Sequence, residues 1–93
     1  MTVGVLTVSI EIPESSSLKD KRRVLRSLLD GMRNKFNISA AELDRLDSHN
    51  YSTFGVACIS NDKAFANRVL DSVADYVRSN PRVTTLDCSI ELI

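Results

Sequence analysis

Near the start of the chain, between Val3 and Ile12, apolar residues occupy every second position without exception, and the positions between them change from apolar to polar along the segment. Such alternation, with a period of two residues, is typical of a half-buried β-strand. Pro13 then ends the predicted strand, because proline cannot donate a hydrogen bond to a neighbouring strand. The face that we expect to be buried carries Gly4, Leu6, Val8, Ile10 and Ile12.

The apolar spacing changes to that of an α-helix between residues 18 and 36. Ser17 is a suitable N-cap, and Asp20 lies in the first turn, where a negative charge interacts favourably with the helix dipole. The helix should end between Asn34 and Asn37, since Asn can adopt the left-handed cap conformation. Gly31 weakens the helix by about 1 kcal/mol, which the apolar stripe outweighs. That stripe consists of Leu18, Leu25, Leu28, Leu29, Met32 and Phe36.

Residues 37–60 resemble two strands joined by a turn, which we place near Ser48–Asn50 because turn-forming residues accumulate there. The first arm is polar and weakly patterned, as expected at the edge of a sheet. The second arm, TFGVACI at residues 53–59, is apolar on both faces and should lie inside the sheet.

A second helix is predicted to begin at Asn61 or Asp62 and to end before Pro81. Its predicted stripe consists of Phe65, Val69, Val73, Tyr76 and Val77. Residues 83–93 alternate again and predict a last strand. The inward side chains of that strand should be Leu86, Cys88, Ile90 and Leu92.

The order β-α-β-β-α-β predicts an α+β fold with two right-handed crossovers that share a central hairpin. This is the ferredoxin-like sandwich, with a four-stranded antiparallel sheet in the order 4-1-3-2 and two helices on one face. We expect residues 1–93 to form a single domain of this kind. The residues assigned to its core are Leu18, Leu25, Leu29, Phe54, Phe65 and Val73.

The composition, 43% hydrophobic and 26% charged, is that of an ordinary soluble globular domain. No apolar run approaches the roughly 20 residues that cross a bilayer, and the alternating N-terminal segment lacks the basic start of a signal peptide. We therefore expect a cytoplasmic protein without membrane contact. Cys58 and Cys88 are too few for a disulfide framework or a zinc site and should be buried, reduced thiols. Neither they nor the single His49 predict a metal or cofactor.

The pattern argues against an enzyme. Phosphoryl chemistry on this type of sandwich needs a glycine-rich loop after the first strand, but residues 13–17 read PESSS and place Glu14 where an anion would approach. Turn formation and helix capping account for the three serines. A polar turn is the favoured explanation of Asp44, Asp47 and His49, with a weak divalent-ion contact as the alternative.

Three segments, SLKDKR at 17–22, FNISAAELD at 36–44 and SND at 60–62, are similar to signature segments of the YlxP-like family of small bacterial proteins. The resemblance extends over essentially the whole chain. It implies a ferredoxin-like fold, but no activity, because none is established for the family. The family's genes often lie beside those of translation initiation and ribosome maturation factors, which implies an association with translation.

Residues 15–36 contain seven of the twelve Lys and Arg residues of a chain whose net charge is zero. Segment 19–35 carries seven positive and two negative charges, +5 in sum, so the remainder carries −5. Basic side chains three and four residues apart can contact successive phosphates, which predicts binding to ribosomal RNA or ribosomal particles. The expected phosphate contacts are Lys19, Arg22, Arg23, Arg26 and Arg33.

Two other interpretations remain open. The basic segment can be a solvated helix face, or it can bind a protein with an acidic surface. Independently, the sheet face opposite the helices should carry Val3, Val5 and either Ala57 or Ile59. An apolar patch of this kind favours a homodimeric interaction domain or small-ligand sensor as the alternative function.

Overall fold

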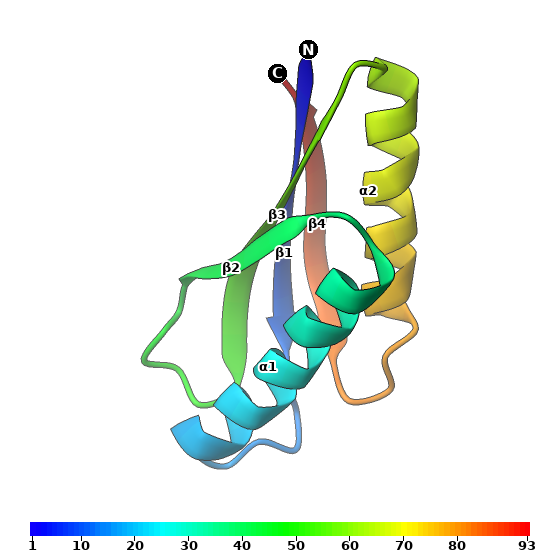
Figure 1. Cartoon of the computed structure of the whole chain (residues 1–93). Coiled ribbons are helices and arrows are strands. Elements are labelled where there is room, and N and C mark those ends of the chain that lie inside the picture. The colour runs from blue at the N-terminus through cyan, green and yellow to red at the C-terminus, as the bar shows by residue number, and fades with distance from the viewer.

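A computed structural model covers all 93 residues and contains four strands and two helices in the order β-α-β-β-α-β (Figure 1). The predicted ferredoxin-like order is therefore confirmed. The elements are β1 (Thr2–Glu11), α1 (Leu18–Lys35), β2 (Ser39–Asp44), β3 (Tyr51–Ser60), α2 (Lys63–Arg78) and β4 (Thr84–Leu92).

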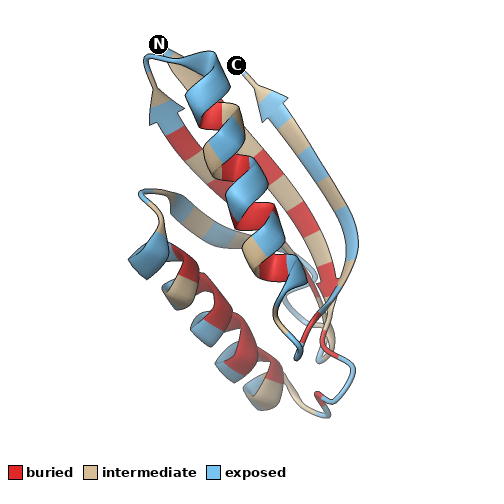
Figure 2. Ribbon diagram, turned by 90° about the vertical axis from the view of Figure 1, so that its right-hand side faces the viewer, coloured by how far each residue is buried: buried red, intermediate tan, exposed pale blue.

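The strands form one antiparallel sheet in the order β2-β3-β1-β4, as predicted. The two most apolar strands, β1 and β3, lie at its centre and pair along their full length, from Thr2 opposite Ser60 to Glu11 opposite Tyr51. Strand β2 lies at one edge, as its polar pattern predicted. Both helices cover the same face of the sheet (Figure 2), so the other face is open.

Side-chain caps define the starts of both helices. The hydroxyl oxygen of Ser17 accepts a hydrogen bond from the backbone N–H of Asp20 at 3.1 Å, which confirms the predicted cap of α1. Of the two candidates for α2, Asp62 is the cap and accepts from two backbone N–H groups. The left-handed cap predicted for residues 34–37 was wrong. Helix α1 ends in an extended residue, Phe36, and the only non-glycine residue with positive φ is Arg45.

Eighteen buried apolar residues form a single core cluster between the sheet and the helices. The inward face of β1 lies in it as predicted, and so do the predicted core residues Leu25, Leu29, Phe54 and Val73. Leu18 is only half-buried. Of the two cysteines, Cys58 is buried as expected, whereas Cys88 is half-buried.

The assignment of Phe65 to the core was wrong, because 51% of its surface is exposed. The buried stripe of α2 is rotated from the predicted one, so Leu70 points inward and Phe65 lies beside the stripe. Two alanines in this stripe allow the helix to approach the sheet closely, since they place little volume between the backbones. The stripe consists of Ala66, Leu70, Val73, Ala74 and Val77.

The inward orientation predicted for Leu86 was also wrong. Ser9 pairs with Asp87 but the next residue, Ile10, pairs with Thr85, so Leu86 is an additional residue in β4 at this point. A bulge of this type reverses the alternation of the strand. Leu86 is consequently exposed, and Thr85 lies opposite the buried Ile10.

The molecule is elongated, with extents of 42 × 21 × 18 Å. Three connections lie together at the end opposite the two chain termini: β1–α1, β2–β3 and α2–β4 (Figure 1). Residues distant in sequence therefore meet beside the first turns of α1.

Candidate nucleic-acid interface

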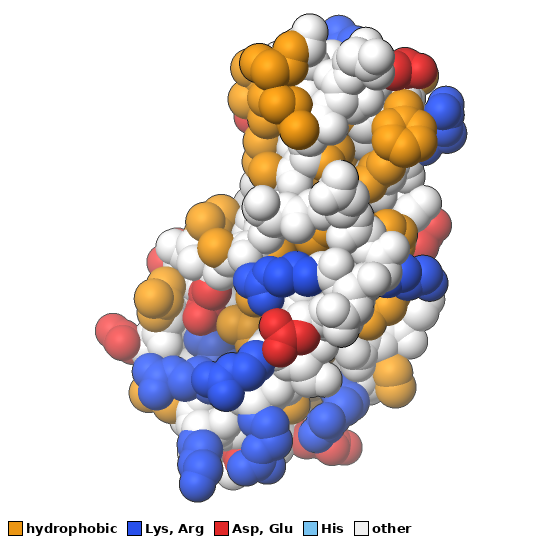
Figure 3. Space-filling model, viewed as in Figure 1, with side chains coloured by type: hydrophobic (Ala, Val, Ile, Leu, Met, Phe, Trp, Pro, Cys, Tyr) orange, Lys and Arg blue, Asp and Glu red, His pale blue; other side chains and the backbone are white.

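The five basic residues predicted to contact phosphates are all exposed on α1. Their spacing places them opposite the buried face of the helix, which includes Leu25, Leu28 and Met32. Figure 3 shows Lys and Arg side chains gathered over the part of the surface that α1 occupies in Figure 1. The clustering required for a basic surface is therefore present.

Four of these residues take part in none of the three ion pairs of the structure. Successive members are three, one and three residues apart, so their directions span about 100° around the helix axis. We refer to Lys19, Arg22, Arg23 and Arg26 together as the basic face.

Arg33 differs from the other predicted residues because it has two partners within the chain. One guanidinium nitrogen lies 3.0 Å from Asp30, and the other donates a hydrogen bond of 2.6 Å to the carbonyl oxygen of Ala40. These contacts connect the end of α1 to β2. Arg33 is therefore a structural contact, and we leave it out of the basic face.

Lys21 belongs to the same basic segment but is completely buried. Its ammonium group lies 3.0 Å from a carboxylate oxygen of Glu42 and donates a hydrogen bond to the backbone carbonyl of Arg45. The same Glu42 oxygen accepts a hydrogen bond of 2.8 Å from the hydroxyl of Ser52. Because its charge is paired inside the protein, Lys21 contributes nothing to a surface for anions.

The three serines before α1 have the capping and turn roles that were predicted. Besides the Ser17 cap, the hydroxyl of Ser15 shares its proton between the carbonyl oxygens of Ser17 and His49, which joins the β1–α1 and β2–β3 connections. Hydrogen bonds from the hydroxyl and backbone N–H of Ser16, together with the nearby charge of Arg23, hold the pKa of Asp20 below its ordinary value. Asp20 is therefore an anion that the first turn already uses.

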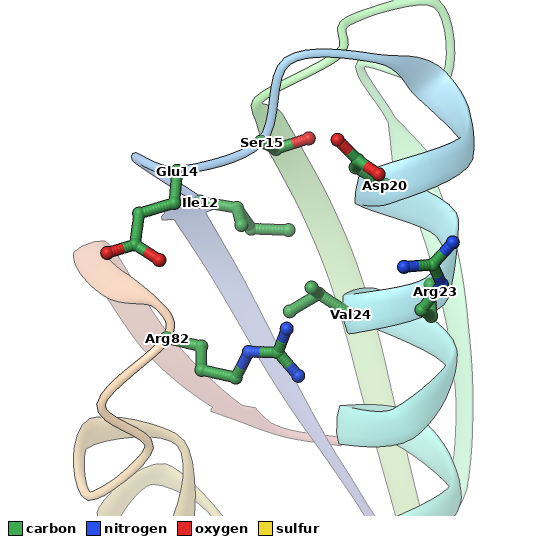
Figure 4. A pocket seen from close by; sticks show the side chains of 7 residues that line it. All are labelled: Ile12, Glu14, Ser15, Asp20, Arg23, Val24 and Arg82. Atoms are coloured by element: carbon green, nitrogen blue, oxygen red, sulfur yellow. The ribbon is translucent and has the colours of Figure 1, made fainter.

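Arg82 is the functional candidate that the sequence analysis missed. It lies in the α2–β4 connection, far from α1 in sequence, yet its side chain extends toward α1 and lines a pocket together with Arg23 (Figure 4). Arg82 is exposed and takes part in no ion pair. No local pattern could have indicated it, because only the fold brings these two segments together.

Other sites have less support from the geometry. The structure contains no group of three or more His, Cys, Asp or Glu side chains placed to hold one metal ion. Neither α1 nor α2 combines the length and apolar composition that a membrane-spanning helix requires.

Comparisons with known proteins agree with the fold. A designed protein, De novo designed protein Foldit4, superposes with a TM-score of 0.53 over 98% of this chain and 96% of its own, at 11% sequence identity, which shows a shared fold alone. Uncharacterized protein YlxP of Bacillus subtilis (strain 168) is 31% identical over 81 residues, which are 87% of this chain and 88% of that protein. The model of the family described as protein of unknown function (DUF503) matches residues 3–90. The chain therefore belongs to the DUF503 family, to which its likeness to YlxP also points.

Proposed function

We propose that this protein is a non-enzymatic, cytoplasmic accessory of translation that binds ribosomal RNA or a ribosomal particle through the basic face and Arg82. The observation that carries this proposal is the group of cationic side chains without carboxylate partners, Lys19, Arg22, Arg23, Arg26 and Arg82. The genes that accompany this family favour RNA over an acidic protein as the partner.

The dimensions of the basic face suit a nucleic-acid backbone. Lys19 and Arg26 are seven residues apart, which corresponds to about 10 Å along the helix axis. Successive nucleotides of one DNA strand rise by about 3.4 Å along the duplex axis, so about three phosphates lie within that axial length. Contacts of this kind position the protein and release counterions, but they do not distinguish one base from another.

The open sheet face is less suited to RNA. Proteins with this architecture commonly stack bases on aromatic residues of the sheet. Here the one ring on the open face of the two central strands is that of Tyr51, and the guanidinium group of Arg45 already lies over it at 5.5 Å. We therefore place the RNA on α1.

The test is co-sedimentation with ribosomal particles. Replacement of Arg22 and Arg26 by Glu should abolish binding of the full chain while leaving its circular dichroism unchanged. The matched control is Lys63→Glu with Arg68→Glu, which makes the same change in charge at two exposed residues of α2 that form no ion pair. Retention of binding by the first variant, equal loss in the control, or binding that persists in 1 M salt would contradict the proposal.

An apolar patch on the open sheet face supports a homodimer as the second candidate function. Ile59 is 68% exposed and Leu43 is 58% exposed, and Val3, Val5 and Ala57 lie between them only partly buried. Association by extending the sheet at β2 is disfavoured, because Glu42 points inward and the pairing of β2 is irregular between Glu42 and Asp44. The two sheets would instead pack face to face.

Sedimentation equilibrium tests this second candidate. The protein should have the mass of two chains at micromolar concentration. The variant Ile59→Glu should have the mass of one chain, because a dimer would bury the new carboxylate in its interface. The mass of one chain for the unsubstituted protein would exclude the homodimer.

A further inference from the structure

A pocket of about 220 Å³ lies where the basic face meets the α2–β4 connection (Figure 4). Its apolar wall is formed by Ile12 and Val24, both of which belong to the buried core. The pocket therefore has a packed apolar surface on one side and charged side chains at its rim.

Hydrogen-bond donors enter this pocket from two separate elements. Arg23 projects from α1 and Arg82 from the α2–β4 connection, and Figure 4 shows the guanidinium group of Arg82 directed toward α1, whereas that of Arg23 lies against α1, one turn from Asp20. Neither guanidinium forms an ion pair, although the charge of Arg23 is near enough to Asp20 to lower the pKa of that carboxyl. Both are available to a ligand.

Two carboxylates also line the pocket, and they differ in how far the chain already uses them. An oxygen of Asp20 already accepts hydrogen bonds from Ser16. Glu14 is exposed, forms no ion pair, and extends from the β1–α1 connection. The pocket thus offers two planar donors, the free carboxylate of Glu14 and the second oxygen of Asp20.

This combination fits a nucleobase better than a phosphate group. A phosphate offers only acceptors, and the two carboxylates would repel it. Guanine carries the acceptor O6 beside the donors N1–H and N2–H₂, so one guanidinium can bond to O6 while a carboxylate accepts from both donors. Adenine cannot make that paired contact to a carboxylate. Unpaired bases are also commonly stacked on the plane of an arginine.

We propose that this pocket binds one unpaired guanine of an RNA strand whose backbone lies on the basic face. Glu14 accepts hydrogen bonds from the N1–H and N2–H₂ groups, Arg82 donates to O6, and the base lies against Ile12 and Val24. Arg23 lies where the pocket meets the basic face and contacts the phosphate next to the guanine. This inference rests on the proposed RNA binding and adds base selectivity to it.

Fluorescence anisotropy with three single-stranded RNA 11-mers tests the proposal. All are oligouridine, and they differ only in the central base, which is guanine, adenine or uracil. The full chain should bind the guanine strand at least about fivefold more tightly than the others, as expected for one bidentate base contact. Inosine at the centre lacks the N2–H₂ group and should give an intermediate affinity.

Paired variants connect that preference to the pocket. Glu14→Ala and Arg82→Ala should each remove the preference for guanine. Glu91→Ala and Arg68→Ala are the matched controls at exposed residues outside the pocket and should retain it. Circular dichroism of each variant would show that the fold is unchanged.

The possible failures are distinguishable. Equal affinity for all three strands, with binding still abolished by Arg22→Glu and Arg26→Glu, would overturn the guanine site and leave the proposed function standing. Competition by inorganic phosphate as strong as that by guanosine monophosphate would show an anion site and likewise overturn it. Failure of every strand and of ribosomal particles to bind would overturn both proposals.

Discussion

A buried ion pair, Lys21 with Glu42, joins helix α1 to the edge strand of the sheet. Lys21 is fully enclosed, whereas the side chain of Glu42 is 19% exposed and has a second partner in Ser52. Without Glu42, Lys21 would therefore be a buried charge with no counter-charge. Without Lys21, Glu42 would keep its contact with Ser52 and with water. The pair also holds Arg45, the residue with positive φ, in place through its carbonyl group.

Removal of Glu42 should be the more damaging change. Glu42→Ala leaves a buried ammonium without a counter-charge and should lower the free energy of unfolding by about 3–5 kcal/mol. Lys21→Met should cost less, because Glu42 retains the hydroxyl of Ser52 and some contact with water. Urea denaturation at pH 7 would compare the two variants, and a larger loss for Lys21→Met would contradict this account.

The two cysteines should differ in reactivity. Burial raises the pKa of the Cys58 thiol, whereas Cys88 is half-buried. Because the thiolate is the reactive form, iodoacetamide at pH 8 should modify Cys88 first and Cys58 only after unfolding. Peptide mass spectrometry would measure the labelling of each cysteine, and faster labelling of Cys58 than of Cys88 would contradict the burial of Cys58.

The free energy of unfolding should also fall as the pH rises through 9.0, the ordinary pKa of the thiol, because the unfolded chain then releases a proton that folded Cys58 keeps.

At the scale of the elements, a glycine determines how closely the two helices approach. A Cβ atom added at Gly31 would lie 2.2 Å from the hydroxyl oxygen of Tyr76. The ring of Tyr76 is held edge-on against Phe36, with centroids 6.0 Å apart. The glycine that weakens α1 as an isolated helix is thus the residue that fits α2 beside it.

Gly31→Ala should therefore destabilise the protein even though alanine favours the helical conformation by about 1 kcal/mol. The same substitution in a Tyr76→Phe background should be neutral or stabilising, since the ring carbon Cζ lies at 3.3 Å, a distance that a small shift accommodates. Thermal denaturation of the four chains of this cycle would measure the coupling. Equal effects in both backgrounds would rule out the contact with the tyrosine hydroxyl.

The observed burial of Leu25 in α1 and exposure of Phe65 in α2 lead to a second prediction at the scale of the elements. Leu25→Ala in α1 removes a buried side chain and should cost about 2–5 kcal/mol. Phe65→Ala removes a side chain that is 51% exposed and should cost much less, about 1 kcal/mol or below. Chemical denaturation of both variants would check this order, and a comparable loss in Phe65→Ala would restore Phe65 to the core.

At the scale of the whole molecule, all buried apolar residues belong to one cluster that includes both helices and the sheet. We therefore expect one cooperative unfolding transition. Tyrosine fluorescence, which reports on Tyr51 and Tyr76, should change at the same urea concentration as the far-ultraviolet circular dichroism. Separate midpoints would contradict a single cooperative transition.

Local patterns determined most of the fold. The period of two in β1, the helical spacing of α1, and the Ser17 and Asp62 caps are properties of short segments, so the element order followed from them. Apart from the left-handed cap predicted at the end of α1, the errors occurred where two elements must fit together. Phe65 lies beside the buried stripe because the alanines of α2 pack more closely on the sheet, and Leu86 is turned outward by a bulge in the pairing with β1.

The sequence by itself established the antiparallel sandwich and the concentration of positive charge in α1, because hydrophobic period and residue type act over a few neighbouring residues. Only the tertiary structure decided which of those charges reach solvent. It enclosed Lys21 against Glu42, bonded Arg33 to the carbonyl oxygen of Ala40 in β2, and placed Arg82 at the same pocket as Arg23. Each of these outcomes depends on the distance between side chains, which the packing of the helices on the sheet sets. One feature of the sequence indicated that Lys21 is buried. It lies four residues before Leu25, and therefore on the side of α1 that carries the apolar stripe.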